Sequence, residues 1–83
     1  MRSCVAIIRL STGIEIYPLH IVRAVFTPKG SPISRVRGAE LIAASDTLQI
    51  ETDTNLHVVH GVLARKDAEA LEAAGVPVFG LMD

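Results

Sequence analysis

The sequence is poor in cysteine and aromatic residues and has no long apolar run. Cys4 is the only cysteine, which excludes a disulfide within the chain and is typical of a reducing cytoplasm. The aromatic side chains are Tyr17, Phe26 and Phe79, so the core must be built from Ile, Val, Leu and Ala. The apolar run at residues 4–8 is shorter than the roughly 7–15 residues of a secretory signal, and no run approaches the ~18 residues that span a bilayer. We therefore expect a cytoplasmic protein that does not bind membranes.

The sequence also lacks a strong net charge, although its charges are unevenly distributed. The formal net charge is −1 at pH 7, which favours neither nucleic acid nor a membrane surface. Residues 1–37 hold six basic side chains and one acidic side chain, whereas residues 38–83 hold two basic and eight acidic ones. This asymmetry is consistent with a basic binding face. The simpler interpretation is that the two halves pack together so that their charges interleave.

The C-terminal part of the chain predicts a strand, a helix and a second extended segment. Residues 56–63 are apolar and β-branched, as in a strand. Residues 67–74 are rich in good helix formers, and Gly75 follows where a left-handed helix cap is favoured. Residues 76–79 are extended because Pro77 disfavours helix in the residue before it. The helix is expected to pack its apolar side chains on a sheet and to expose Glu69 and Glu72; the packed residues are Leu71, Ala68 and Ala64.

The N-terminal part predicts three strands. Residues 5–10 are apolar on both alternating faces, which is typical of a central strand that is covered on both sides. A tight turn at residues 11–13 leads to a second strand at 14–17, with Ile14 and Ile16 inward, and Pro18 ends it. Residues 21–27 form a third strand. Its expected faces are Val22, Ala24 and Phe26 on one side and Ile21, Arg23 and Val25 on the other.

The middle of the chain is less regular. Residues 28–32 contain two prolines and a glycine and predict a loop suited to an exposed recognition surface. Residues 33–37 favour no element, and residues 39–44 fit either a short helix or an edge strand, of which we predict the strand. Residues 47–52 alternate cleanly, with Leu48 and Ile50 inward, and a hairpin turn follows at 53–55. The whole pattern predicts a single small α+β domain over residues 1–83, with an antiparallel sheet of five to six strands and one C-terminal helix packed on it.

The sequence contains no arrangement that is typical of catalysis or metal binding. His57 and His60 would share one face of a helix, but the valines around them predict a strand, on which they point to opposite faces. Cys4 lies in an apolar run, where a thiol is inert. The acidic cluster at residues 46–53 lacks the spacing of a calcium loop. There is no glycine-rich phosphate loop, GxSxG, CxxC or HExxH motif. We therefore expect a protein that is not an enzyme, with no cofactor and no metal.

The strongest functional feature is the basic side chains in the first half of the chain. Arginine pairs bidentately with carboxylates and phosphates, and we predict partner-binding roles for Arg23, Lys29, Arg35 and Arg37. The simpler interpretation is a solvated basic face, or one that pairs with the acidic half of the same chain. Nucleic-acid binding usually adds aromatic stacking platforms, and this half of the chain supplies only Tyr17 and Phe26.

These observations lead to one functional expectation and one alternative. In its size and its lack of catalytic motifs the chain is similar to the small accessory proteins of bacteria and their phages, some of which bind and block a larger host protein. We expect a non-catalytic protein-binding module that regulates or blocks another protein. The alternative is a small nucleic-acid-binding protein that uses the basic N-terminal half.

The sequence also predicts a homodimer. A chain of 83 residues buries only roughly 60–65% of its unfolded surface. Nevertheless, 49% of its residues are apolar, which is more than one sheet face and one helix cover. A two-fold axis could place the basic half of each copy against the acidic half of the other.

Overall fold

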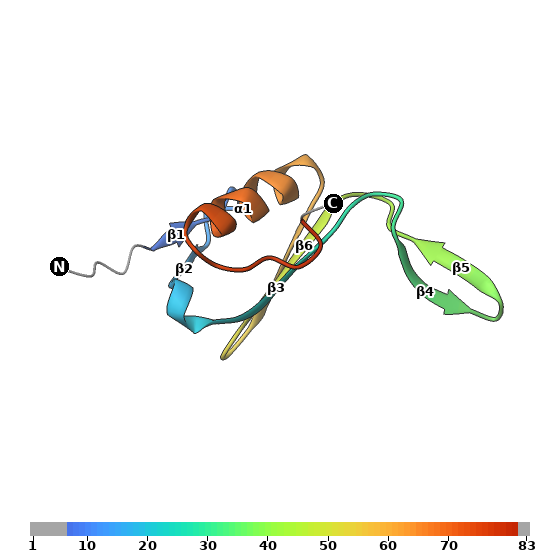
Figure 1. Cartoon of the computed structure of the whole chain (residues 1–83), viewed down its shortest axis with the longest axis horizontal. Coiled ribbons are helices and arrows are strands. Elements are labelled where there is room, and N and C mark those ends of the chain that lie inside the picture. The colour runs from blue at the N-terminus through green and yellow to red at the C-terminus, as the bar shows by residue number, and fades with distance from the viewer. Residues whose placement is uncertain (1–6, 82–83) are drawn as a thin grey trace.

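A computed structural model describes residues 7–81, which form short antiparallel sheets and one α-helix (Figure 1). The pairs are β1–β2, β4–β5 and, in the central sheet, β3–β6–β7. The fold class is α+β, as predicted, but the strands are divided among three small sheets instead of one. In chain order the elements are β1 (Ile8–Arg9), β2 (Glu15–Ile16), the 3₁₀ helix η1 (Pro18–His20), β3 (Ile21–Thr27), β4 (Pro32–Val36), β5 (Ala39–Ile42), β6 (Thr47–Thr52), β7 (Leu56–His60) and α1 (Val62–Ala73).

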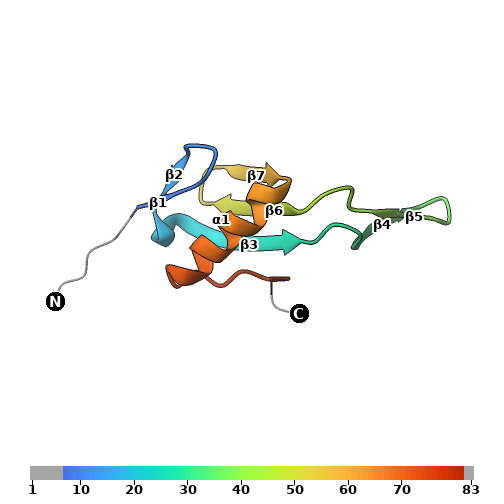
Figure 2. The ribbon, with the colours of Figure 1, turned by 90° about the horizontal axis from the view of Figure 1, so that it is seen from above.

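The core lies between the central sheet and α1. In the register of β3 and β6, Ala24 lies opposite Ile50 and Phe26 opposite Leu48. Because side chains alternate along each strand, these four side chains share one face of the sheet, and all four are buried. Helix α1 crosses this face, as Figure 2 shows. The predicted packing face of the helix is confirmed, because its apolar core residues are fully buried: Ala64, Ala68 and Leu71.

The helix ends in the predicted glycine cap. Gly75 has a φ of 94°, in the left-handed region that glycine adopts without strain. Its N–H donates to the Glu72 carbonyl at 3.0 Å, and the Val76 N–H donates to the Leu71 carbonyl at 3.0 Å. This is the hydrogen-bond pattern of a Schellman motif. The motif turns the chain back towards the sheet and buries Val76 beside the core.

The last described segment runs parallel to the outer edge of β3. The Phe79 N–H donates to the Ala24 carbonyl at 2.9 Å, and the Phe26 N–H donates to the Phe79 carbonyl at 2.7 Å. At Gly80, which has a φ of 85°, a Cβ atom would lie 2.2 Å from the Phe26 carbonyl oxygen. Only glycine therefore allows this approach to β3.

The β1–β2 hairpin closes one end of the core. Its buried side chains are Ile8, Leu10 and Ile16. Residues 11–13 form the predicted turn, and the Gly13 N–H donates to the Leu10 carbonyl at 2.9 Å. At the far end of the molecule, β4 and β5 form a second hairpin that projects away from the central sheet (Figures 1 and 2). We call this hairpin, residues 32–42, the arm. The longest dimension of the structure is 54 Å, against 23 Å for the other two.

The arm closes with a two-residue turn. Arg37 and Gly38 occupy it with φ values of 53° and 81°, both in the left-handed region. Two consecutive residues of this kind are typical of a type I′ turn, which matches the twist of the paired strands. Glycine is suited to such a position, whereas arginine adopts it at a cost of roughly 1–2 kcal/mol.

Several predicted details are wrong, and each has a physical reason. The expected strand at 56–63 ends at His60, and α1 begins at Val62, because Gly61 turns the chain with a φ of 89°. The expected central strand at 5–10 is the short β1 in a two-stranded hairpin, with Ile7 and Arg9 exposed. Positions 4 to 6, including the single cysteine, lie outside the described residues.

Two side-chain placements also differ from the prediction. Val22 does not share the buried face of Ala24, because a bulge shifts the register between Ile21 and Arg23 and leaves Val22 exposed. Ile16 is buried as expected, but Ile14 is partly exposed. The strands predicted at 21–27, 39–44 and 47–52 are confirmed as β3, β5 and β6. Within the part of the chain that the structure describes, no helix is long and apolar enough to cross a membrane.

Candidate binding surface

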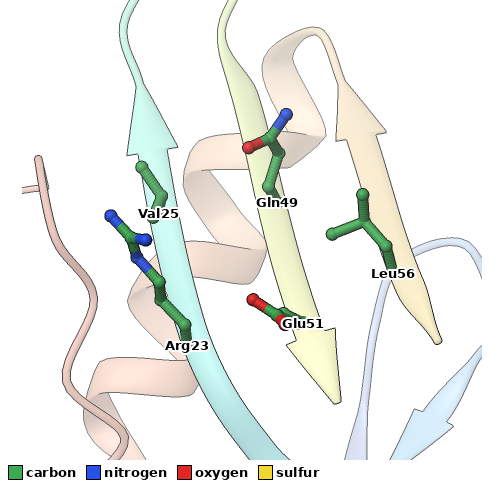
Figure 3. A pocket seen from close by; sticks show the side chains of 5 residues that line it. All are labelled: Arg23, Val25, Gln49, Glu51 and Leu56. Atoms are coloured by element: carbon green, nitrogen blue, oxygen red, sulfur yellow. The ribbon is translucent and has the colours of Figure 1, made fainter. Parts of the chain in front are cut away.

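Among residues 7–81, no element covers the face of the central sheet opposite α1. Figure 3 looks onto this face, with α1 behind the strands. Because side chains alternate along each strand, the residues that avoid the core share this side. Its aliphatic side chains include Leu56, which is 59% exposed, and Val58, which is 41% exposed. We call this side of the sheet the open face; its residues are Arg23, Val25, Thr27, Thr47, Gln49, Glu51, Leu56, Val58 and His60.

A shallow depression of about 190 Å³ lies at the centre of the open face. Its walls include Arg23 and Glu51, which are directly opposite each other on β3 and β6. The Arg23 guanidinium carbon lies 5.9 Å from the centroid of the Phe79 ring. Within residues 7–81 the only salt bridge joins Arg9 to Glu15. Arg23 and Glu51 therefore lie opposite each other in the strand register, but their side chains form no ion pair.

The arm exposes every one of its residues. Val36 and Leu41 lie on one of its faces, because Val36 pairs with Ala39, two positions before Leu41. Arg35 pairs with Glu40 on the other face, again without a salt bridge. The arm thus combines apolar side chains on a solvent-exposed ribbon with a neighbouring positive and negative charge.

A groove of about 330 Å³ connects the arm to the open face. Ile33 of β4 contributes one wall at the base of the arm. His60, at the end of β7, contributes another, and its Nδ1 lies 3.4 Å from the Thr47 hydroxyl. The groove places the base of the arm and the open face on one side of the molecule; its lining residues are Thr27, Ile33, Ala43, Ala44, Ser45, Thr47, Gln49 and His60.

The four basic residues singled out by the sequence are all exposed but do not form one cluster. Arg23 lies on the open face, Lys29 in the loop at residues 28–31, Arg35 on β4 and Arg37 in the turn of the arm. An acidic residue lies beside most of them. Arg23 pairs in register with Glu51 and Arg35 with Glu40, and the Lys29 N–H donates to Asp46 Oδ1 at 2.8 Å.

The sequence interpretation did not identify the aliphatic residues of this surface. The side chains of Ile33, Val36, Leu41 and Ile42 are 46–58% exposed. The sequence does contain a local signal for the hairpin. Arg37 and Gly38 stand between two short apolar segments, and a residue pair that ends in glycine at such a place indicates a two-residue hairpin turn. It would have assigned residues 33–36 to a strand and Arg37 to the turn. No local signal indicates that this hairpin lies beyond the core.

The two closely spaced histidines lie on β7, as predicted. His57 pairs with Ile50 and His60 with Thr47, so the two side chains are on opposite faces of the sheet. His57 lines a polar cleft of about 240 Å³ with Tyr17 and His20, whose ring centroids are 5.5 Å apart. Within residues 7–81, no three His, Cys, Asp or Glu side chains are grouped so that they could hold a metal ion.

In comparisons with protein families, curated proteins and solved structures, none matches this chain.

Proposed function

We propose that this chain is a non-catalytic protein-binding module that uses the arm as its main contact surface. The observation that supports this proposal is a hairpin with four exposed aliphatic side chains and no buried residue. A two-stranded hairpin is at best marginally stable in water without packing on another surface. Val36 and Leu41 lie on one face of the arm and Ile42 on the other, and exposed apolar groups on such an element suit a site that another macromolecule covers.

The size of the hydrophobic contribution limits how the arm can bind. Complete burial of a Val, Leu or Ile side chain contributes roughly 1.5–3 kcal/mol. The arm has four such side chains that are about half exposed, so their coverage contributes on the order of 3–6 kcal/mol. Association itself costs about 4–15 kcal/mol. The arm therefore needs additional contacts on the same side of the molecule, and the groove and the open face are adjacent to it.

The charge distribution favours a protein partner over nucleic acid. Nucleic-acid affinity comes mainly from basic side chains that neutralise phosphates. Here Arg23 and Arg35 each lie opposite a glutamate in register, so neither strand pair has a local net positive charge. Matched positive and negative groups are instead suited to setting the orientation of a protein partner.

A capture experiment with the purified chain as bait tests this proposal. We expect the variant Leu41→Ser with Ile42→Ser to lose proteins that the wild-type chain retains from a lysate of its source cell. The matched control is Leu19→Ser, which removes an 80% exposed leucine from η1, outside the arm. Both variants should unfold within about 0.5 kcal/mol of wild type, because exposed substitutions have small effects. If wild type and both variants capture the same proteins, the arm is not the contact surface.

A further inference from the structure

We infer that the outer edge of β7 binds an extended segment of a partner protein as an additional strand of the central sheet. The strand order of this sheet is β3–β6–β7, so β7 lies at its edge and pairs with β6 on one side (Figure 2). Strand addition at such an edge is a recurring mode of peptide recognition, in which backbone hydrogen bonds supply the affinity. The edge is separate from the arm, so this inference goes beyond the proposed function and assigns a second contact surface.

Two hydrogen bonds at the ends of the β6–β7 pair show which residues of β7 turn their backbone groups outward. The Thr52 N–H donates to the Asn55 carbonyl at 2.8 Å, and the Gly61 N–H donates to the Asp46 carbonyl at 2.8 Å. In an antiparallel pair, hydrogen-bonded positions alternate with positions whose N–H and C=O groups point away from the partner strand. Every second residue of β7 therefore directs its backbone groups away from β6; these residues are Leu56, Val58 and His60.

The same alternation accounts for the opposite edge of the sheet, which the chain covers itself. It leaves Ala24 and Phe26 of β3 with outward backbone groups, and both residues bond to Phe79 of the parallel segment. This edge also contains the bulge between Ile21 and Arg23, and bulges protect edge strands from unwanted pairing. The chain thus completes one edge of its central sheet with a short extended segment.

The β7 edge has no such cover or protection. Among residues 7–81, no second strand and no isolated bridge pairs with β7. Natural edge strands are usually protected by charged side chains, proline or bulges, and β7 has none of these over its five residues. Its three residues with outward backbone groups are also exposed. The edge is therefore suited to pairing with another extended chain.

The surroundings of the edge favour a single extended segment over a whole second copy. The β1–β2 hairpin lies on the helix side of β7, because Tyr17 and His57 line the same polar cleft. A second copy that paired through β7 about a two-fold axis would bring its own hairpin to this side, next to the first. An added segment instead requires only the spacing between neighbouring strands, about 4.8 Å.

The charges at the two ends of β7 specify the composition of the added segment. Asp53 lies in the turn before β7, whereas Arg65 and Lys66 lie on α1, which begins after it. The first turn of α1 has no acidic residue, and a helix N-terminus carries partial positive charge. Antiparallel pairing is the more stable kind. The segment that fits best is therefore antiparallel, with an acidic residue at its N-terminal end, a basic residue at its C-terminal end and apolar side chains beside Leu56 and Val58.

A peptide of this composition tests the inference. The probe is acetyl-Glu-Val-Thr-Val-Thr-Val-Lys-amide, titrated into the isotope-labelled full chain and followed by NMR. We expect saturable binding with the largest chemical-shift changes in β7. Amide exchange should become slower at Leu56, Val58 and His60. It should not change at His57 and Val59, whose N–H groups already bond to β6.

Methylation of the peptide nitrogens gives the decisive comparison. In the expected register the valine N–H groups of the peptide face β7, whereas its threonine N–H groups face away. N-methylation of the valines should weaken binding more than about tenfold, whereas N-methylation of the threonines should leave it within about twofold. Exchanging the terminal Glu and Lys of the peptide should also weaken binding, because like charges then meet at both ends of β7.

A variant of the chain provides a second test. Val58→Pro removes an outward N–H of β7 but no hydrogen bond to β6, and it should abolish peptide binding. Val25→Thr is the matched control, because Val25 lies on the same face of the sheet but in β3. It should bind the peptide as wild type does. The methylated peptides are compared on the wild-type chain, so that comparison does not depend on the folding of Val58→Pro.

Three outcomes overturn the inference. The first is failure of the unmethylated peptide to bind, and the second is equal binding of the two methylated peptides. The third is a wild-type mass near twice 8.9 kDa that falls to that of one chain in Val58→Pro, because a second copy then occupies the edge. Leu41→Ser with Ile42→Ser should bind the peptide as wild type does. The result is therefore read separately from the capture experiment, which tests the arm.

Discussion

The Asp67 carboxylate accepts two hydrogen bonds from Ser11, although the two residues are far apart in sequence. The Ser11 N–H donates to Oδ1 at 2.9 Å and the Ser11 hydroxyl donates to Oδ2 at 2.7 Å. Asp67 is on α1 and only 4% exposed, whereas Ser11 is in the turn between β1 and β2. A buried carboxylate is unfavourable unless hydrogen bonds satisfy it. This pair therefore fixes the first hairpin to the helix.

We predict that Asp67→Ala lowers the free energy of unfolding by about 1.5–3 kcal/mol, because hydrogen bonds to a charged group contribute about that much. Asp67→Asn should cost less, since the amide keeps one acceptor for the Ser11 N–H. Glu69→Ala, on the exposed side of the same helix, is the control and should have little effect. Urea denaturation provides the measurement. A smaller loss for Asp67→Ala than for Asp67→Asn would contradict this account.

A double-mutant cycle with Ser11→Ala isolates the contact itself. Ser11→Ala removes one of the two hydrogen bonds and leaves the backbone one in place. The losses from Ser11→Ala and Asp67→Ala should therefore be non-additive, with a coupling of at least about 0.5 kcal/mol. Additive losses would show that the pair does not act as a unit.

The second prediction concerns the centre of the helix–sheet contact. Leu71 is fully buried, so Leu71→Ala should lower the free energy of unfolding by about 2–5 kcal/mol. Leu71→Asp should be more damaging, because it buries a charge without a partner. Leu63→Ala is the matched control on the same helix, since Leu63 is exposed. If Leu71→Ala shifts the urea midpoint by the equivalent of less than ~1 kcal/mol, the helix is peripheral to the core.

The third prediction compares two glycines with similar backbone conformations. Gly80→Ala should be strongly destabilising, because its Cβ would meet the Phe26 carbonyl oxygen, part of the β3 backbone. Gly75 has a comparable φ but no atom within 4 Å of a Cβ, so Gly75→Ala should cost only the left-handed strain of roughly 1–2 kcal/mol. Denaturation of both variants separates the two effects. Equal losses would show that the parallel segment does not depend on the close approach at Gly80.

The strands that the sequence predicts correctly have a buried side, because a buried side requires apolar side chains at alternate positions. β3 and β6 each have a buried side, and this leaves alternating apolar residues such as Leu48 and Ile50. The helix was predicted from its run of good helix formers and from its glycine cap. In the arm both faces are exposed, so no alternation develops and residues 33–37 appeared irregular. The bulge that exposes Val22 depends on strand register, which local sequence does not specify.

The sequence predicted the candidate surface only in part, because it does not specify which residues of paired strands lie opposite each other. The basic residues could be counted from the sequence, but the acids opposite Arg23 and Arg35 follow from pairing between distant strands. These pairs place residues of the basic half beside residues of the acidic half, which is consistent with the interpretation that the charges of the two halves interleave. The sequence indicates an excess of apolar residues but does not show which of them are exposed, since hydropathy alone does not distinguish a buried Ile from one at the surface.

The last prediction concerns the turn of the arm, where Arg37 is strained. Its φ of 53° is favourable for asparagine and glycine but costs other residues roughly 1–2 kcal/mol. Arg37→Asn should therefore stabilise the arm and slow amide hydrogen exchange in β4 and β5 by about fivefold or more. The control is Arg35→Asn, which removes the same charge from a strand position with ordinary extended backbone and should speed exchange, because asparagine is unfavourable in strands. Faster exchange in both variants would mean that lost charge, and not backbone strain, governs the arm. Slower exchange in Arg37→Asn alone would show that backbone strain at Arg37 limits the stability of the arm.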